Sequence, residues 1–211
     1  MFEELSLANE IDHNLLDIRH SDKLTKIITD IQPDIVFHLA AQPLVIRSYQ
    51  EHKQTWETNV MGSIYLLESL RLLENKCAIV MVTTDKVYKN NEWEYGYREN
   101  DELGGVDPYS SSKAASEIAI NSWRSSYCGN LSYQKNNLFI ASARSGNVIG
   151  GGDWSPNRIV PDAIKALKDK KEIIVRNPYS TRPWQHVLEP LNGYLLLAEQ
   201  LTNNGNDFTS A

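Results

Sequence analysis

Apolar residues follow two patterns that alternate along the chain. Continuous apolar runs occupy 34–41 and 77–84, and a third begins at 137 and leads into a glycine-rich stretch that ends at 152. Continuous runs are typical of strands buried on both faces of a parallel sheet. Between them, apolar residues at helical spacing predict amphipathic helices at 20–32 and 55–73.

The remaining segments extend the same order. The segment 107–127 predicts a long helix, because Asp107 can cap its first turn and Pro108 is tolerated there. Strands alternating with helices predict an α/β fold with a parallel sheet and right-handed crossovers. After Gly152 the pattern loosens, which indicates a substrate-side region. The other expected elements are a short strand at 14–18, a helix at 158–170, a strand at 172–176 and a helix at 188–201.

Charge and composition argue against several classes of partner. The 211 residues carry a net charge of −6 with a pI near 5.4, whereas nucleic-acid binding needs a basic face. No apolar run approaches the ~20 residues of a membrane span, and the acidic start MFEEL does not resemble a signal peptide. The histidines show no metal-ligand spacing, so we expect no metal site. The distant Cys77 and Cys128 indicate reduced thiols in a cytoplasmic protein.

The chemistry-bearing residues stand where strands are expected to end. Thr84, Asp85 and Lys86 directly follow the second apolar run. Tyr109 and Lys113 begin the next helix, and a separation of four places their side chains on one helix face. Open α/β sheets bind ligands at the carboxyl ends of their strands. We therefore expect these five side chains at the edge of a ligand crevice.

Spacing alone does not identify a catalytic pair. Tyr49 and Lys53 are also four residues apart, but no buried strand with a polar end precedes them. We expect Tyr49 and Lys53 to be solvated surface residues. The strand context is what distinguishes Tyr109 and Lys113.

At this point the residues resemble the extended short-chain dehydrogenase/reductase family, in which Thr, Tyr and Lys act on a nicotinamide-binding α/β sheet. Longer strings resemble its nucleotide-sugar 4,6-dehydratases, and among them the branch that acts on CDP-glucose. The dTDP-glucose branch carries Glu after Thr-Asp, whereas this chain has Lys86. The strings, which cover nearly the whole chain, are FHLAAQPLV, TWETNVMGS, GYRENDELGGVDPYSSSK, SGNVIGGGDW, RIVPD and RPWQHVLEPLNGYLLLA.

The resemblance implies a Rossmann-like doubly wound parallel sheet that binds NAD, with CDP-glucose as the small-molecule substrate and a homo-oligomeric full-length protein. It also implies nucleotide-sugar metabolism, in deoxysugar biosynthesis for lipopolysaccharide O-antigen. The implied catalytic residues are Thr84, Asp85, Lys86, Tyr109 and Lys113. The implied cofactor contacts are Asp17, Ile18, Ala40, Ala41, Gln42, Asn59, Tyr109 and Lys113. The implied contacts to the nucleotide diphosphate are Asn147, Arg158 and Arg182, since guanidinium groups suit a pyrophosphate.

The implied reaction begins with oxidation of the glucose at C4. Tyr109, as phenolate, takes the O4 proton while Thr84 orients that hydroxyl and the hydride goes to NAD. Free tyrosine has a pKa of ~10, so the site must supply roughly three units, or ~4 kcal/mol. A cation about 4 Å away is worth ~4 kcal/mol at an effective dielectric of 20. Lys113 and the nicotinamide charge are expected to supply it.

Elimination of water across C5–C6 then needs an acid and a base. Asp85 fits the acid that protonates the leaving hydroxyl, provided that it is held neutral. Lys86 has two readings that stay open: a neutral base at C5, which needs burial or a neighbouring cation, or a charged group that stabilises the enolate. Trp93 either walls the sugar pocket or anchors an exposed loop. His186 is expected to be structural.

One departure from the family pattern affects the whole interpretation. The family begins with a strand, a glycine-rich loop and a helix that hold the dinucleotide pyrophosphate, and this chain has no glycine before Gly62. The late GNVIGGG lacks the Gly-Lys-Ser/Thr of a phosphate loop and cannot substitute. We interpret the chain as truncated at both ends, with a partial dinucleotide-binding domain at 1–152 and a partial nucleotide-sugar-binding region at 153–211.

In isolation, such a chain is expected to be inactive, prone to aggregation and a poor binder of NAD. The strand at 34–41 is expected to lack its neighbour and to expose an apolar edge made of Ile35, Val36, Phe37 and Leu39. Two other functions stay open. One is a nucleotide-sugar epimerase or reductase, which shares Thr-Tyr-Lys without needing Asp85 and Lys86. The other is a non-catalytic remnant that keeps only the outline of the fold.

Overall fold

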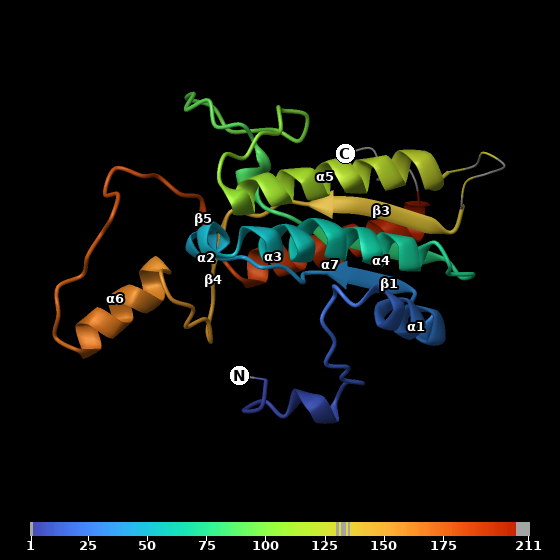
Figure 1. Ribbon diagram of the computed structural model, residues 1–211, viewed down its shortest axis with the longest axis horizontal. Coiled ribbons are helices and arrows are strands. Elements are labelled where there is room, and N and C mark those ends of the chain that lie inside the picture. The colour runs from blue at the N-terminus through green and yellow to red at the C-terminus, as the bar shows by residue number, and fades with distance from the viewer. Residues whose placement is uncertain (1, 130, 132–133, 135, 206–211) are drawn as a thin grey trace.

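A parallel three-stranded sheet forms the centre of the computed structural model, which describes residues 2–129, 131, 134 and 136–205 (Figure 1). The strands β1 (Ile35–His38), β2 (Cys77–Val82) and β3 (Leu138–Ala143) lie in that order. In the parallel register, Ile79 of β2 is opposite Val36 on one side and Ile140 on the other. Each strand comes from one of the continuous apolar runs, and the predicted α/β class with a parallel sheet is confirmed.

Helices cover both faces of this sheet. The helices α1 (Ser21–Ile31), α4 (Gly62–Leu70) and α5 (Pro108–Tyr127) pack on one face, and α7 (Leu188–Asn204) covers the other. Successive strand residues point to opposite faces, so Ile79 faces Leu67 of α4 while Val80 faces Leu201 of α7. The helix α7 comes from the C-terminal part of the chain and returns to the sheet. The proposed division at residue 152 stays a prediction.

A π-helical turn interrupts the helical segment that leads into α4. The helix α3 (His52–Trp56) passes through a π turn, η2 (Glu57–Met61), directly into α4. The predicted helix at 55–73 therefore begins earlier than expected and contains an irregular turn. Such turns often occur at functional sites. This one carries Asn59, whose side chain is fully buried.

The remaining elements lie beyond the carboxyl ends of the strands (Figure 1). They comprise α2 (Val45–Gln50), the parallel pair β4 (Asn147–Ile149) and β5 (Trp184–His186), and α6 (Ile159–Lys168). Short 3-10 turns occur at η1 (Leu7–Asn9) and η3 (Asp85–Val87). A Cβ at Gly146 would lie 2.6 Å from Cγ of Pro183, so glycine allows β4 to approach β5. The glycine-rich stretch thus serves strand packing here.

Two predicted strands do not form. The segments 14–18 and 172–176 have no strand structure. Leu15 is 95% exposed and Ile174 is 85% exposed, because neither segment has a neighbouring strand to pair with. A strand needs such a partner for its backbone hydrogen bonds. In the part of the chain that the structure describes, no helix is both long and apolar enough to cross a bilayer.

The free edge of β1 is apolar. Ile35, Phe37 and Leu39 are exposed, as expected, whereas Val36 is half-buried against α1 and α4. Val36 belongs to the same unpaired backbone edge, but its side chain points to the helix-covered face, because alternate strand residues point to opposite faces. A free edge of this kind is a template for pairing with another chain.

We predict that the isolated 211-residue polypeptide self-associates through β1. Phe37→Lys should reduce the associated fraction severalfold, because the charge opposes strand pairing at the edge. Leu15→Lys, which makes the same change on a segment outside the sheet, should have little effect. Sedimentation velocity measures both. A monodisperse parent polypeptide, or equal improvement by the two variants, would contradict this prediction.

Candidate functional site

The turn after β2 places three polar residues at the carboxyl edge of the sheet. Thr84 caps η3: its hydroxyl accepts a hydrogen bond from the Lys86 backbone N–H at 3.4 Å and donates to Oδ1 of Asp85 at 3.1 Å. Backbone hydrogen bonds from Thr83 to Ala143 and from Asp85 to Ser145 fasten this turn to the end of β3. The turn is therefore fixed at two points to the end of β3.

The first turns of α5 bring the second group of residues to the same edge. The Asp107 carboxylate accepts hydrogen bonds at 3.0 Å from the backbone N–H groups of Tyr109 and Ser110, and Pro108 occupies the first turn. The predicted cap is thereby confirmed. Tyr109 and Lys113 are 7% and 6% exposed, so both polar side chains are buried on one helix face.

Burial dominates the electrostatics of this pair. It raises the pKa of Tyr109, while a hydrogen bond with Thr84 and the charge of Arg158 lower it. Burial also lowers the pKa of Lys113 to about 8, against the carboxylate of Glu117. In this structure desolvation outweighs the groups that favour the phenolate, and the depression expected from Lys113 together with the nicotinamide charge stays a prediction.

The Lys113 ammonium has donors to spare. It donates to the Val82 carbonyl oxygen at 3.2 Å. An ammonium carries three N–H donors, and this is the hydrogen bond that the described residues provide. A buried ammonium in this state can bind the hydroxyl groups of a ligand placed at the end of β2.

Two buried amide side chains hold the loop that follows β1. The Asn59 amide bonds to both the N–H and the C=O of Gln42, at 2.8 and 3.2 Å, and donates to Ser112 of α5 at 2.9 Å. The Gln42 amide donates to Thr55 and bonds to the backbone of Leu44. Both amides are used within the protein, and their role in cofactor binding stays a prediction.

The remaining predicted cofactor residues lie at the surface beside this loop. Ala40 is exposed and Ala41 is half-exposed. Asp17 pairs with Arg19, whose hydrogen bonds lower the pKa of the carboxyl to about 2. A Cβ at Gly62 would lie 2.7 Å from Cγ2 of Ile18, so this glycine lets Ile18 rest on the start of α4.

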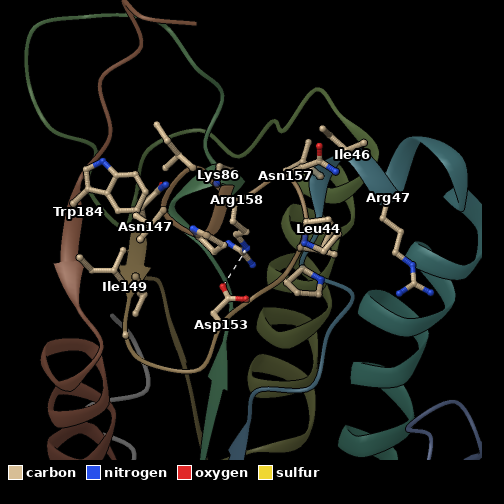
Figure 2. Close-up of a pocket in the computed structure, with 18 of the residues that line it drawn as sticks. Leu44, Ile46, Arg47, Lys86, Asn147, Ile149, Asp153, Asn157, Arg158 and Trp184 are labelled. Atoms are coloured by element: carbon tan, nitrogen blue, oxygen red, sulfur yellow. Dashed lines mark ion pairs between the residues drawn. The ribbon is translucent and has the colours of Figure 1, made fainter. Parts of the chain in front are cut away.

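A cavity of about 510 Å³ opens next to the turn after β2 (Figure 2). Its walls come from α2, β4, β5, α6 and the segment between β4 and α6. Its polar lining residues include Lys86, Asn147, Asp153 and Arg158, with Trp184 on one wall and Arg47 on α2 at the opposite side. Three predicted site residues, Lys86, Asn147 and Arg158, are thus brought together.

Polar atoms in this cavity are left without hydrogen-bond partners. Oδ1 of Asn147 and Nε of Arg158 are buried and make no hydrogen bond within the described residues. Arg158 and Asp153 form an ion pair at 3.5 Å, drawn as a dashed line in Figure 2. That ion pair is made through the same Nε, so Arg158 is partly compensated by Asp153, and the acceptor left unmatched is Oδ1 of Asn147. Buried polar atoms are usually satisfied, so this acceptor favours a polar ligand.

Other residues named from the sequence lie outside the cavity. Arg182 is exposed and donates to the Thr181 carbonyl at 2.6 Å. Trp93 stacks between Tyr95 and Tyr97 in the loop after β2, without lining the cavity. His186 accepts the Leu188 N–H at the start of α7, in agreement with a structural role.

The Tyr49–Lys53 pair lies at the surface, and two cavity residues were not predicted from the sequence. Tyr49 is 57% exposed and Lys53 pairs with Glu57 at the surface, as expected. Arg47 and Trp184 line the cavity without having been predicted. Trp184 stood within the RPWQH string that resembled the family, whereas Arg47 carried no sequence signal. Among the described residues, no group of three or more His, Cys, Asp or Glu could hold a metal ion.

Comparisons with known proteins agree with this architecture. The family model described as GDP-mannose 4,6 dehydratase matches residues 3–210. The chain is 46% identical over 209 residues to CDP-glucose 4,6-dehydratase of Salmonella typhimurium, covering 99% of this chain and 58% of the relative. It is 27% identical to dTDP-D-glucose 4,6-dehydratase of Dictyostelium discoideum, over 92% of this chain and 45% of that protein.

A solved structure shares the fold. The dTDP-glucose 4,6-dehydratase of Streptomyces venezuelae, crystallised as a double mutant with NAD bound, superposes with a TM-score of 0.72 at 24% identity. The match covers 90% of this chain and 54% of that chain. This chain therefore spans about half the length of the proteins that it matches.

A buried histidine below the site gives a pH-dependent stability. His38, at the end of β1, lies 2.9 Å from the Ser63 hydroxyl through Nε2. Burial and the nearby charge of Lys113 lower its pKa from 6.5 to about 4. The unfolded chain therefore takes up a proton at this histidine first as the pH falls, so its contribution to stability is complete above pH 6.5 and is lost toward pH 4.

We predict that His38→Asn removes this part of the pH dependence. The free energy of unfolding of the parent, relative to that of the variant, should fall by about 3 kcal/mol between neutral pH and the folded-state pKa. Urea denaturation at a series of pH values measures this difference. His13→Asn, in the N-terminal segment, is the control. Parallel pH profiles for the parent and His38→Asn would show the assignment to be wrong.

Proposed function

The chain belongs to the GDP-mannose 4,6 dehydratase family, and on that premise we propose that the whole protein carrying it converts CDP-glucose to CDP-4-keto-6-deoxyglucose with bound NAD. One observation carries the proposal: the buried Tyr109 and Lys113 lie beside the Thr84 turn, and Lys86 of the same turn lines the cavity that holds Asn147 and Arg158. The choice of CDP-glucose is supported by the 46% identity to the Salmonella typhimurium protein.

The residues present fit the nicotinamide end of an NAD site. Lys113 keeps unused donors that can bind ribose hydroxyl groups, and Ala40 and Ala41 offer an apolar surface after β1. Asp17 and Ile18, the latter resting on the start of α4, are the residues assigned to the adenine. The 211 residues contribute no glycine-rich pyrophosphate loop near their start, since no glycine precedes Gly62. When bound, NAD accepts a hydride from the sugar and later returns it.

Tyr109 and Thr84 act on the O4 hydroxyl of the glucose. Tyr109 removes the O4 proton, and Thr84 holds the hydroxyl in line. Because burial raises the pKa of Tyr109, the phenolate requires positive charge close by. Arg158 supplies part of it in the structure. The charged Lys113 supplies more when a ligand closes the site and removes water.

Asp85 and Lys86 act in the elimination step. Asp85 is held by the Thr84 hydroxyl at the turn and protonates the hydroxyl that leaves C6. Lys86 lines the cavity on the same turn, and we infer that it takes the proton that C5 loses. Asn147, through its amide N–H group, and Arg158, through its guanidinium, bind the diphosphate from the cavity wall, and the exposed Arg182 is the third group assigned to it.

The cellular setting is part of the same proposal. Buried free thiols at Cys77 and Cys128 and the net charge of −6 support a cytoplasmic enzyme. We place it in nucleotide-sugar metabolism, as a homo-oligomer that supplies deoxysugars for lipopolysaccharide O-antigen. Similarity to the Salmonella typhimurium dehydratase supports this setting.

Tyr109→Phe should abolish turnover in the whole protein that carries this chain. Removing the proton acceptor should lower kcat by orders of magnitude with little change in the dissociation constant for CDP-glucose. Product formation is followed by NMR and substrate binding by calorimetry. Tyr49→Phe makes the same change at the surface pair and should be silent. Near-parental turnover in Tyr109→Phe would refute the role of Tyr109. Conversion of CDP-glucose to an epimer by the parent protein, without loss of water, would favour the alternative function of a nucleotide-sugar epimerase.

Asp85→Asn should separate oxidation from elimination. In D₂O, the variant should still exchange the C5 proton of CDP-glucose for deuterium, because the 4-keto group that acidifies C5 can form, while the 6-deoxy product is lost. Recovered substrate is analysed by NMR. Asp101→Asn, in the loop after β2, is the matched control. Absence of both exchange and product would mean that Asp85 is needed before elimination.

A further inference from the structure

A buried carboxylate lies one turn beyond Lys113 on α5. Glu117 is 5% exposed. It accepts hydrogen bonds from the hydroxyl of Thr83 and, at 2.8 Å, from that of Ser142. It also accepts two from Arg144, through Nε and Nη2, both at 3.0 Å. A single side chain thus joins α5 to the ends of β2 and β3.

Arg144 extends these contacts to the loop after β2. Its Nη1 donates to the hydroxyl of Tyr88 at 2.9 Å and to the carbonyl oxygen of Glu99 at 3.1 Å. Its guanidinium lies 4.9 Å from the centre of the Tyr88 ring. The Glu117–Arg144 pair therefore fastens four parts of the site: α5, both strand ends and the loop at 88–104.

The network keeps Glu117 ionised. Burial disfavours the charge, but hydrogen bonds from Arg144, Thr83 and Ser142, with the charge of Arg144, bring the pKa of the carboxyl below its ordinary value. The resulting negative charge lies one helical turn from the Lys113 ammonium and raises the pKa of Lys113 against the effect of burial. Glu117 thus opposes the loss of charge at Lys113.

We propose that Glu117 is a positioning residue for Lys113, which it keeps charged while it holds α5 in register with the Thr84 turn. The effect of Glu117 on catalysis rests on the function proposed for Tyr109 and Lys113, whereas its effect on the charge of Lys113 does not. The Thr83 hydroxyl that binds Glu117 adjoins Thr84, so the same carboxylate sets the placement of both halves of the site.

The other ionisable groups near Lys113 leave this role to Glu117. Tyr109 shares its helix face, and His38 of β1 is kept neutral at physiological pH by a pKa of about 4. Arg144, at the end of β3, pairs with Glu117 itself, and Arg124 lies further along α5. On the other elements packed against α5, Asp85 and Lys86 belong to η3. The remaining charged side chains form surface ion pairs: Arg47 with Glu51, Lys53 with Glu57 and Arg71 with Glu68.

Two substitutions separate charge from geometry. Glu117→Gln keeps the length of the side chain and loses the charge. Glu117→Asp keeps the charge and shortens the reach. Glu117→Gln alone leaves the Arg144 guanidinium buried and unpaired. A double variant, Glu117→Gln with Arg144→Gln, removes both charges and replaces the single variant if that one fails to fold. Glu102→Gln, an exposed carboxylate paired with Lys89, is the control.

The first measurement is the titration of Lys113 in the whole protein, by NMR with lysine labelled with ¹³C at Cε and the signal assigned from Lys113→Met. The pKa should fall by about one unit or more in Glu117→Gln, alone or with Arg144→Gln, and stay near the parental value in Glu117→Asp. Equal pKa values in parent and Glu117→Gln, or equal shifts in Glu117→Asp and Glu117→Gln, would overturn the proposal. This titration needs no substrate, so it is independent of the proposed function.

The second measurement is the pH profile of kcat/KM for CDP-glucose. The alkaline limb should move to lower pH in the charge-removing variants by the shift found for Lys113, and return in Glu117→Asp. A profile that keeps its position while activity falls uniformly would reduce Glu117 to a stabilising contact. Absence of CDP-glucose turnover in the parent protein would refute the proposed function and leave the titration result standing.

Discussion

Burial of the Lys113 ammonium beside Tyr109 is the constraint on which the rest of the site depends. A buried ammonium is unfavourable unless hydrogen bonds and an opposite charge compensate for the lost water. Here the Val82 carbonyl and Glu117 provide that compensation, and both require α5 to lie across the carboxyl ends of β2 and β3. The parallel register of the sheet and the placement of α5 are therefore parts of one arrangement.

Polar side chains fasten α5 at two places along the carboxyl ends of the strands. On one side, the π turn brings Asn59 to Ser112 and to the loop after β1. On the other, Glu117 reaches Ser142 and Arg144 at the end of β3. Apolar packing under α4 and α7 positions the elements, whereas these directional contacts fix the helix to within hydrogen-bond distance of the strand ends.

The sequence predicted those parts whose cause is local. Continuous apolar runs identify β1, β2 and β3; both faces of β2 and β3 are covered, whereas β1 is covered on the face that holds Val36. A capping aspartate identifies the start of α5. The strand-end rule then brings Thr84, Tyr109 and Lys113 together. The apolar segments 14–18 and 172–176 fail as strands because pairing depends on a neighbour that the local pattern does not contain.

The parts that escaped prediction depend on tertiary contacts. The π turn at Asn59 and the approach of Arg47 to the cavity leave no periodic signal. The Glu117–Arg144 pair had a partial signal in the sequence, because Glu117 continues the four-residue spacing of Tyr109 and Lys113 on the buried face of α5. Its partner lies 27 residues further along the chain, and only the fold brings the two together.

A crystal structure of the whole protein with CDP-glucose and NAD, trapped by Tyr109→Phe, tests the central claim most directly. The account places O4 of the glucose within about 3.2 Å of the Thr84 hydroxyl and beside the ring at position 109. It also places the C6 hydroxyl next to Asp85 and the diphosphate between Asn147 and Arg158. A sugar bound with O4 turned away from Thr84, or a diphosphate that contacts neither Asn147 nor Arg158, would contradict the account.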